Sequence, residues 1–295
     1  MTDAVAVTVS RFSRVRHRRV PWLGSPWLWL GVILGGLITA WLLREWVTPY
    51  GPADVHATRI MLPLGSPGSP LGTDSFGRDM LSRLLASVPV SVAAGVLPAT
   101  ASMGLGTALG LVSGYFGGRL DRLIMSVMDV LLAFPFILLA ILAVAILGPS
   151  FWNAMIAVAI AILPRNARII RAETLSLRER DFVVAARLSG AGAPSIIVQH
   201  MLPNVLPTAL VVGSTEIGQM IAATAGLSYL GLGVQQPDVD WGTLIAEGGK
   251  LIAVAPALAL IPSALVAAVS IAFVLVGDDL RHRLAGGESG RSERL

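Results

Sequence analysis

The sequence predicts an all-α membrane protein, and three observations support that class: its composition, its apolar segments and the placement of its positive charges. Of its 295 residues, 54% are hydrophobic and 14% are charged, with a mean hydropathy of +0.73. Soluble domains carry about 25% charged residues. A chain this long with so few charges cannot cover itself with a polar surface, so we expect a lipid bilayer around it. The absence of cysteine excludes disulfides, cysteine nucleophiles and thiolate metal sites.

Six segments are apolar enough to cross a bilayer, for which a helix needs about 20 residues. They lie at about 27–47, 88–113, 126–147, 151–164, 205–229 and 254–277. The fourth is short and is expected to continue as far as Arg168. Pro135 and Pro262 are expected to bend the third and sixth, and the sixth is expected to end at Gly277. The first lacks a small-residue cleavage site after its long apolar core, which favours a retained span over a signal peptide.

The positive charges predict the orientation of these spans. Of the 22 Lys and Arg residues, most fall in the N-terminal tail and in the segments after spans two, four and six. The exceptions are Arg44, Arg59, Arg78, Arg83 and Lys250. Because such residues concentrate on the cytoplasmic side, both termini are predicted to be cytoplasmic. This topology accounts for the high isoelectric point without a nucleic-acid partner. The predicted organisation is a basic tail (1–26), a six-helix transmembrane domain (27–285) and a C-terminal tail (286–295).

A long outer loop is predicted at 48–86. Its first part is rich in Gly and Pro, and a helix-like segment follows, for which Asp74 is a plausible N-cap. Two interpretations remain open for this helix: an ordinary interfacial helix, or a contact site for an external partner.

The inner loop, at 165–204, is the most informative part of the sequence. A helical run through Ala185 and Ala186 stops near Gly190, and a second apolar helix starts near Pro194. This second helix is expected to end before span five begins. A short cytoplasmic helix pair with small side chains lets the surface of another protein approach closely.

This inner loop resembles the cytoplasmic coupling loop of ABC importer permeases. That pattern reads Glu-Ala-Ala, three residues, Gly, nine residues, Ile, one residue and Leu-Pro. The matching positions here are Ala185, Ala186, Gly190, Leu202 and Pro203. Val184 stands where the family has Glu, and it cannot form an ion pair with an ATPase subunit, although docking by shape would survive. His200 replaces Ile, as is usual in the peptide branch of the family.

Five further stretches resemble the dipeptide, oligopeptide and nickel branch of that family, and they occur in the expected order. They are 71–79, 114–121, 175–181, 226–237 and 241–242. The resemblance implies a permease subunit of a prokaryotic inner-membrane importer, forming half of the translocation path. Its implied partners are a second homologous permease chain, ATP-binding subunits (two chains or one fused chain) and an external substrate-binding protein. Peptides are the favoured cargo, while nickel chelates and haem-like molecules stay open.

The chain lacks the motifs of an enzyme. Gly249 and Lys250 are followed by Leu251, so no phosphate-binding loop with Lys-Ser/Thr is present. No His-Glu-x-x-His motif occurs, and the four histidines fall outside the predicted spans. We therefore expect no catalytic residue, metal or cofactor in this chain, with ATP and Mg²⁺ on the partner ATPase.

Span five carries polar residues that are costly in a bilayer. Thr215, Glu216 and Gln219 interrupt an apolar run, and Glu216 and Gln219 share a helical face with positions 220 and 223. One hypothesis is that this face lines the translocation path. The alternative is a carboxyl group hydrogen-bonded between helices. A stand-alone secondary transporter or channel, using Glu216 as an ion site, is the rival function, and a membrane scaffold is a third.

Span two carries glycines at four-residue spacing: Gly106, Gly110 and Gly114. Such small residues allow helices to pack closely. They predict a helix contact, either within the chain or with a partner permease.

Overall fold

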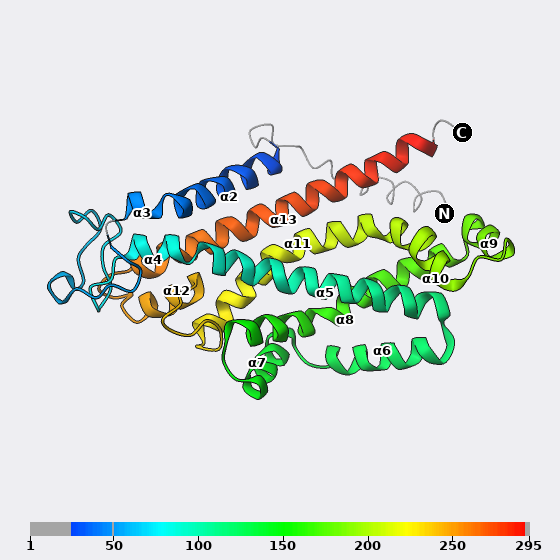
Figure 1. The fold of residues 1–295 in the computed structure, drawn as a ribbon, viewed down its shortest axis with the longest axis horizontal. Coiled ribbons are helices and arrows are strands. Elements are labelled where there is room, and N and C mark those ends of the chain that lie inside the picture. The colour runs from blue at the N-terminus through cyan, green and yellow to red at the C-terminus, as the bar shows by residue number, and fades with distance from the viewer. Residues whose placement is uncertain (1–24, 49, 293–295) are drawn as a thin grey trace, which may run out of the picture.

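The computed structural model describes residues 25–48 and 50–292, with side chains described as far as residue 284. Four long helices form the body of the molecule: α5 (Val88–Phe116), α8 (Phe151–Arg178), α11 (Leu202–Tyr229) and α13 (Ala257–Ser292). They lie lengthwise beside one another, and α2 (Pro26–Leu42) runs along α13 at one edge (Figure 1). The described part is all-helical with isolated β-bridges, which confirms the predicted class.

Shorter helices occupy the two ends and one side of this body. One end holds α3 (Arg44–Val47), the irregular segment 50–79 with a 3₁₀ turn (Ala57–Arg59), α4 (Met80–Ala86) and α12 (Trp241–Gly249). The other end holds α9 (Asp181–Leu188) and α10 (Ala193–Ser195), followed by the π-helical turn η2 (Ile196–Met201). At the side, α6 (Gly118–Leu132) and α7 (Phe136–Leu147) lie next to α8 (Figure 1).

Within residues 25–48 and 50–292, four helices are long and apolar enough to cross a membrane, and α6 with α7 would make a fifth as one bent span. They correspond to the predicted spans two, four, five and six, with longer bounds: Met80–Phe116, Phe151–Arg178, Ala193–Tyr229 and Ala257–Leu284. The predicted continuation of span four is therefore confirmed. The first predicted span corresponds to α2, an apolar helix of 17 residues.

The predicted bend at Pro135 is a break. Helices α6 and α7 meet at 93°, and Pro135 stands at the N-cap of α7 with ψ near 134°. Proline has no N–H to continue the α6 ladder, and its ring disfavours the helical conformation of the residue before it. The first effect acts at Pro135 and the second at Phe134, so the chain leaves one helix and starts another.

Two predicted helix ends are wrong. Helix α13 does not stop at Gly277 but continues to Ser292. Gly277 allows a close approach to α11, since a Cβ there would lie 2.1 Å from the hydroxyl oxygen of Thr215. The second helix of the inner loop does not end before span five either, because η2 passes directly into α11. Pro203 sits in the first turn of α11, where proline is tolerated.

The glycine repeat of α5 packs against α8 within this chain, which confirms the predicted helix contact. A Cβ on Gly106 would lie 2.7 Å from the Cβ of Asn166, and one on Gly114 would lie 2.7 Å from the Cβ of Thr174. A Cβ on Gly110 would lie 2.8 Å from the carbonyl oxygen of Ala167. The absence of side chains at these positions lets the two backbones touch along three turns.

Candidate functional site

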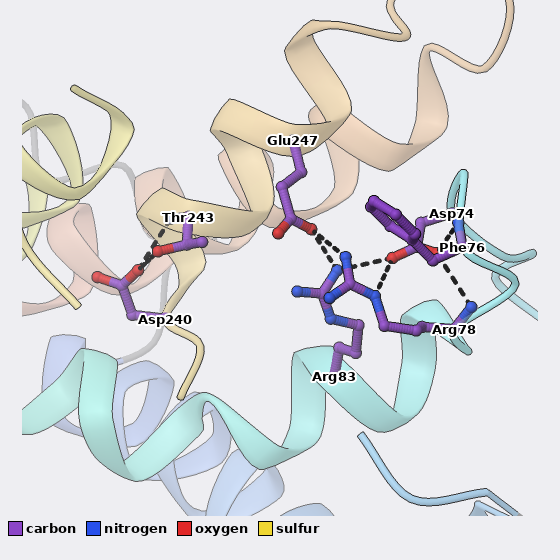
Figure 2. Close-up of polar contacts among 7 residues, drawn as sticks. All are labelled: Asp74, Phe76, Arg78, Arg83, Asp240, Thr243 and Glu247. Carbon is purple, nitrogen blue, oxygen red and sulfur yellow. Dashed lines mark hydrogen bonds and ion pairs between the residues drawn. The ribbon is translucent and has the colours of Figure 1, made fainter. Parts of the chain in front are cut away.

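A cluster of four charged side chains joins the segment 50–79 and α4 to α12 (Figure 2). Arg78 Nε lies 2.6 Å from Asp74 Oδ2, and Arg83 Nη1 lies 2.9 Å from the same oxygen. Glu247 Oε2 accepts from Arg78 Nη2 at 3.1 Å and also pairs with Arg83. The side chains of Asp74 and Arg83 are almost fully buried, while that of Glu247 keeps 23% of its surface exposed. Two acids and two bases therefore balance their charges at this end of the bundle.

The backbone before α4 is shaped to present these charges. Gly77 has φ +74°, and a Cβ there would lie 2.0 Å from the carbonyl oxygen of His56, so glycine is required on both counts. Asp74 accepts backbone N–H groups of Phe76 and Arg78 at 2.8 and 3.0 Å. The predicted N-cap role of Asp74 is wrong, because the cap of α4 is Asp79, which accepts the N–H of Ser82 at 2.8 Å.

Helix α4 is buried in the body of the molecule. The side chains of Met80, Leu84 and Leu85 belong to the buried core, and the helix axis leads into α5. This burial does not fit an ordinary helix at the membrane surface, while a contact of this segment with an external partner stays a prediction.

Helix α12 is fixed on the side facing the bundle. The backbone N–H of Trp241 donates to Ser91 Oγ at 2.9 Å, and the indole side chain is 1% exposed. Asp240 caps the helix by accepting the N–H of Thr243 at 2.8 Å. A Cβ on Gly248 would lie 2.5 Å from the carbonyl oxygen of Leu258, so α12 lies directly on the start of α13. Glu247 of α12 points to the two arginines of the charge cluster.

A second polar cluster lies inside the bundle. Asn166 Nδ2 donates to Glu216 Oε2 at 2.9 Å and to Ser102 Oγ at 3.0 Å, which links α8, α11 and α5. All three side chains are buried, and Glu216 is 1% exposed. A buried polar group is stabilised by such bonds and costs free energy without them. The arrangement is that of a carboxyl group bonded between helices.

The predicted polar face of span five is divided between different surroundings. Gln219 is exposed, whereas Glu216 and Met220 are buried. Thr215 is half-buried and lies against Gly277 of α13. The structure therefore does not bring the three predicted path residues together on one exposed face in this chain.

The inner loop forms a knob of two short helices at the opposite end. Val183, Ile196 and Met201 are fully buried and pack in one core cluster with residues of α5 and α8. Ala185, Gly190 and Pro203 are exposed, while Ala186, His200 and Leu202 are half-buried. Gly190 has φ +83° and closes α9, as its position in the sequence predicts. Three of the six predicted coupling residues are therefore exposed and three are half-buried, and their coupling role stays a prediction.

Ion pairs hold α6 against α8 near this knob. Arg171 Nε and Nη2 donate to the two carboxylate oxygens of Asp121, each at 2.6 Å, and Ser113 also donates to Asp121. An exposed pair joins Arg168 to Asp129. Bidentate contacts between arginine and a carboxylate fix direction as well as distance.

Residues 106–280 match the model of a protein family described as the binding-protein-dependent transport system inner membrane component. The chain belongs to this family. Its match covers α6 to α12, the C-terminal part of α5 and most of α13, and so includes the knob and two members of the buried polar cluster, Asn166 and Glu216. The chain is thus a permease component of an ABC importer system, located in the inner membrane.

Individual relatives agree with this assignment. The permease is 43% identical to the glutathione transport system permease protein GsiD of Pectobacterium atrosepticum, over 72% of this chain and 71% of the relative. It is 41% identical to the dipeptide transport system permease protein DppC of Alkalihalophilus pseudofirmus, over 72% and 70%. A chain of the MetNI methionine ABC transporter in an inward-facing conformation has the same fold, with a TM-score of 0.55, 18% identity and coverage of 69% and 97%.

Sequence reasoning missed the part that α12 plays in this permease. It treated Asp74 and Arg78 as part of a loop motif, and it did not single out Glu247. Glu247 and Arg83 are 164 residues apart, so nothing in local spacing pairs them. The available signal was a carboxylate three residues before Lys250, in a short segment that begins with an aspartate cap.

Proposed function

We propose that this chain is one of two permease subunits of an ATP-driven importer for short peptides and forms half of the translocation path. The relatives named for dipeptide and glutathione transport support a peptide cargo, since glutathione is itself a short peptide. A second permease chain would supply the other half of the path, and the cargo would pass through the assembled complex.

The proposed topology has six spans with both termini in the cytoplasm. Helix α2 supplies the first span, and α6 with α7 supplies a broken third span. The four long helices supply spans two, four, five and six. Seventeen residues of helix extend about 25 Å, close to the hydrocarbon thickness of about 30 Å. The C-terminal end of α13 lies at the same end of the molecule as α9 and α10, in keeping with a cytoplasmic C-terminus (Figure 1).

The observation that carries this proposal is the knob of α9 and α10. Its small exposed residues can accept another protein, and its buried residues transmit a push to α5 and α8 because they share one core cluster with those helices. Partner ATPase subunits, as two chains or one fused chain, would dock there and hold the ATP and Mg²⁺. An external binding protein would deliver cargo at the opposite end, around the charge cluster and α12.

Copurification of the tagged chain in mild detergent tests this proposal. We expect a second permease and an ATPase to accompany the wild-type chain. Ala185→Arg places a long charged side chain on the exposed face of α9 and is expected to release the ATPase, whereas the matched control Ala185→Ser keeps the surface small and retains it. Retention of the ATPase by both variants, with unchanged ATP hydrolysis, would contradict docking at the knob.

A further inference from the structure

Three hollows adjoin one another in the outer half of the molecule. One of about 460 Å³ lies beside the charge cluster, and one of about 780 Å³ lies between the outer end of α11 and α12. These two share Gln236, Glu247 and Lys250. The larger one in turn shares Tyr229 and Leu230 with a hollow of about 270 Å³ between α7 and α11. Through these shared residues the three hollows form one depression, and the volumes of the first two each lie within the range of small-molecule sites, about 300–1,000 Å³.

The middle hollow offers both signs of charge on one face of α12. Glu247 lies on α12, and Lys250 follows three positions later as the C-cap, still in the right-handed helical conformation, so the two side chains project from the same side. Glu247 is bonded to the two arginines through Oε2, while its Oε1 makes no hydrogen bond within the described residues. Lys250 is exposed and takes part in no ion pair in the described part of the chain. Gln236, which is exposed and lines the same hollow, adds an amide donor and acceptor.

The hollow between α7 and α11 is apolar. Its α11 wall is built of Ala222, Ala223 and Gly226, and Phe136 and Val158 stand on the other side. Tyr229, half of whose surface is exposed, borders both this hollow and the charged one. An elongated occupant with charged ends and an apolar side chain would therefore match the two hollows together.

We propose that this depression is an outer binding site for short peptides in their zwitterionic form. This inference rests on the peptide import proposed above. Lys250 binds the terminal carboxylate, Oε1 of Glu247 accepts from the terminal ammonium group, and a peptide side chain passes Tyr229 into the apolar hollow. The distances agree, because side chains three residues apart on a helix stand about 5–6 Å from each other. Two extended residues span at most about 7 Å.

The test is uptake by the complete importer in proteoliposomes, with ATP inside and the binding protein outside. The probes are L-alanyl-L-phenylalanine, its C-terminal amide and glutathione. Loss of a charge-assisted contact in Lys250→Met is expected to raise the KM for alanyl-phenylalanine about tenfold while the maximal rate stays unchanged. Lys250→Arg keeps the positive charge and is expected to restore the wild-type KM. The amide lacks the carboxylate, so its uptake is expected to be the same in the wild type and in Lys250→Met.

The outcomes separate the two proposals. If the wild-type importer, supplied with ATP, takes up neither alanyl-phenylalanine nor glutathione, the proposed function fails, and the binding site fails with it. If the wild type imports a peptide and Lys250→Met leaves its KM unchanged, only the binding site is overturned. The binding site is also overturned if Lys250→Met impairs the amide as strongly as the free peptide, since the lysine would then act on the structure and not on the carboxylate.

Discussion

Replacing Gly110 by leucine is expected to force α5 and α8 apart. The first carbon of any side chain there would lie 2.8 Å from the carbonyl oxygen of Ala167, the N of Arg171 and the Cβ of Ile170. Carbon atoms pack at about 3.5–4.0 Å, so the helices would have to separate by roughly 0.7 Å before the rest of the leucine is placed. Overpacking of this kind costs about 1–3 kcal/mol, and sometimes more.

Gly104 supplies the matched control on the same helix. It is exposed, and a Cβ there would meet no atom within 4 Å. Leucine in place of glycine favours a helix by up to about 1 kcal/mol at both positions, so this gain cancels between the two variants. We expect Gly110→Leu to be less stable than Gly104→Leu by about 1–3 kcal/mol, measured as thermal unfolding in mild detergent. Equal melting temperatures would refute the packing assigned to the glycine repeat.

Three further predictions concern polar contacts. Arg83→Met leaves the carboxylates of Asp74 and Glu247 with one partner fewer in a largely buried site. We expect it to lower the free energy of unfolding by about 3 kcal/mol, measured by thermal unfolding. The control is Arg119→Met, at an exposed position, for which we expect no change. The glutamine in Glu216→Gln can still accept a hydrogen bond from Asn166, so we expect unchanged stability and unchanged transport across pH. Glu216→Ala removes the acceptor and is expected to lower the free energy of unfolding by about 1–3 kcal/mol. A changed pH profile of transport in Glu216→Gln would instead favour a role in the path. Asp121→Asn removes the bidentate ion pair with Arg171 and is expected to increase hydrogen exchange in α6 while α5 stays protected. Equal exchange of α6 in the wild type and in Asp121→Asn would show that other contacts hold α6.

Much of the fold is predictable because it follows from local rules. The glycine repeat of α5 predicts a close contact with another helix, and the structure shows that this helix is α8. The knob is predictable because Gly190 permits the positive φ that ends α9, and because Pro194 has a fixed φ that suits the first turn of the next helix. The extent of the break at Pro135 is not predictable in this way, since the same rule allows a kink or a full turn, and only the packing of α7 decides between them.

The candidate sites show where local reasoning ends. A helical wheel places Glu216 and Gln219 on one side of α11, but it does not say which neighbouring helices cover each of them. Glu216 is buried and accepts a hydrogen bond from Asn166 of α8, while Gln219 is exposed. In the same way, counting charges in the outer loop cannot find their partner on α12, because the pairing depends on how the chain returns after α11.

The measurement that tests the account most directly is peptide uptake into proteoliposomes that contain this chain, its permease partner and the ATPase. The account predicts uptake that requires ATP, the ATPase and the external binding protein, and that stops with Ala185→Arg in this chain while Ala185→Ser continues. Uptake by this chain alone, in the absence of ATP, would contradict the account and would make the chain a stand-alone carrier.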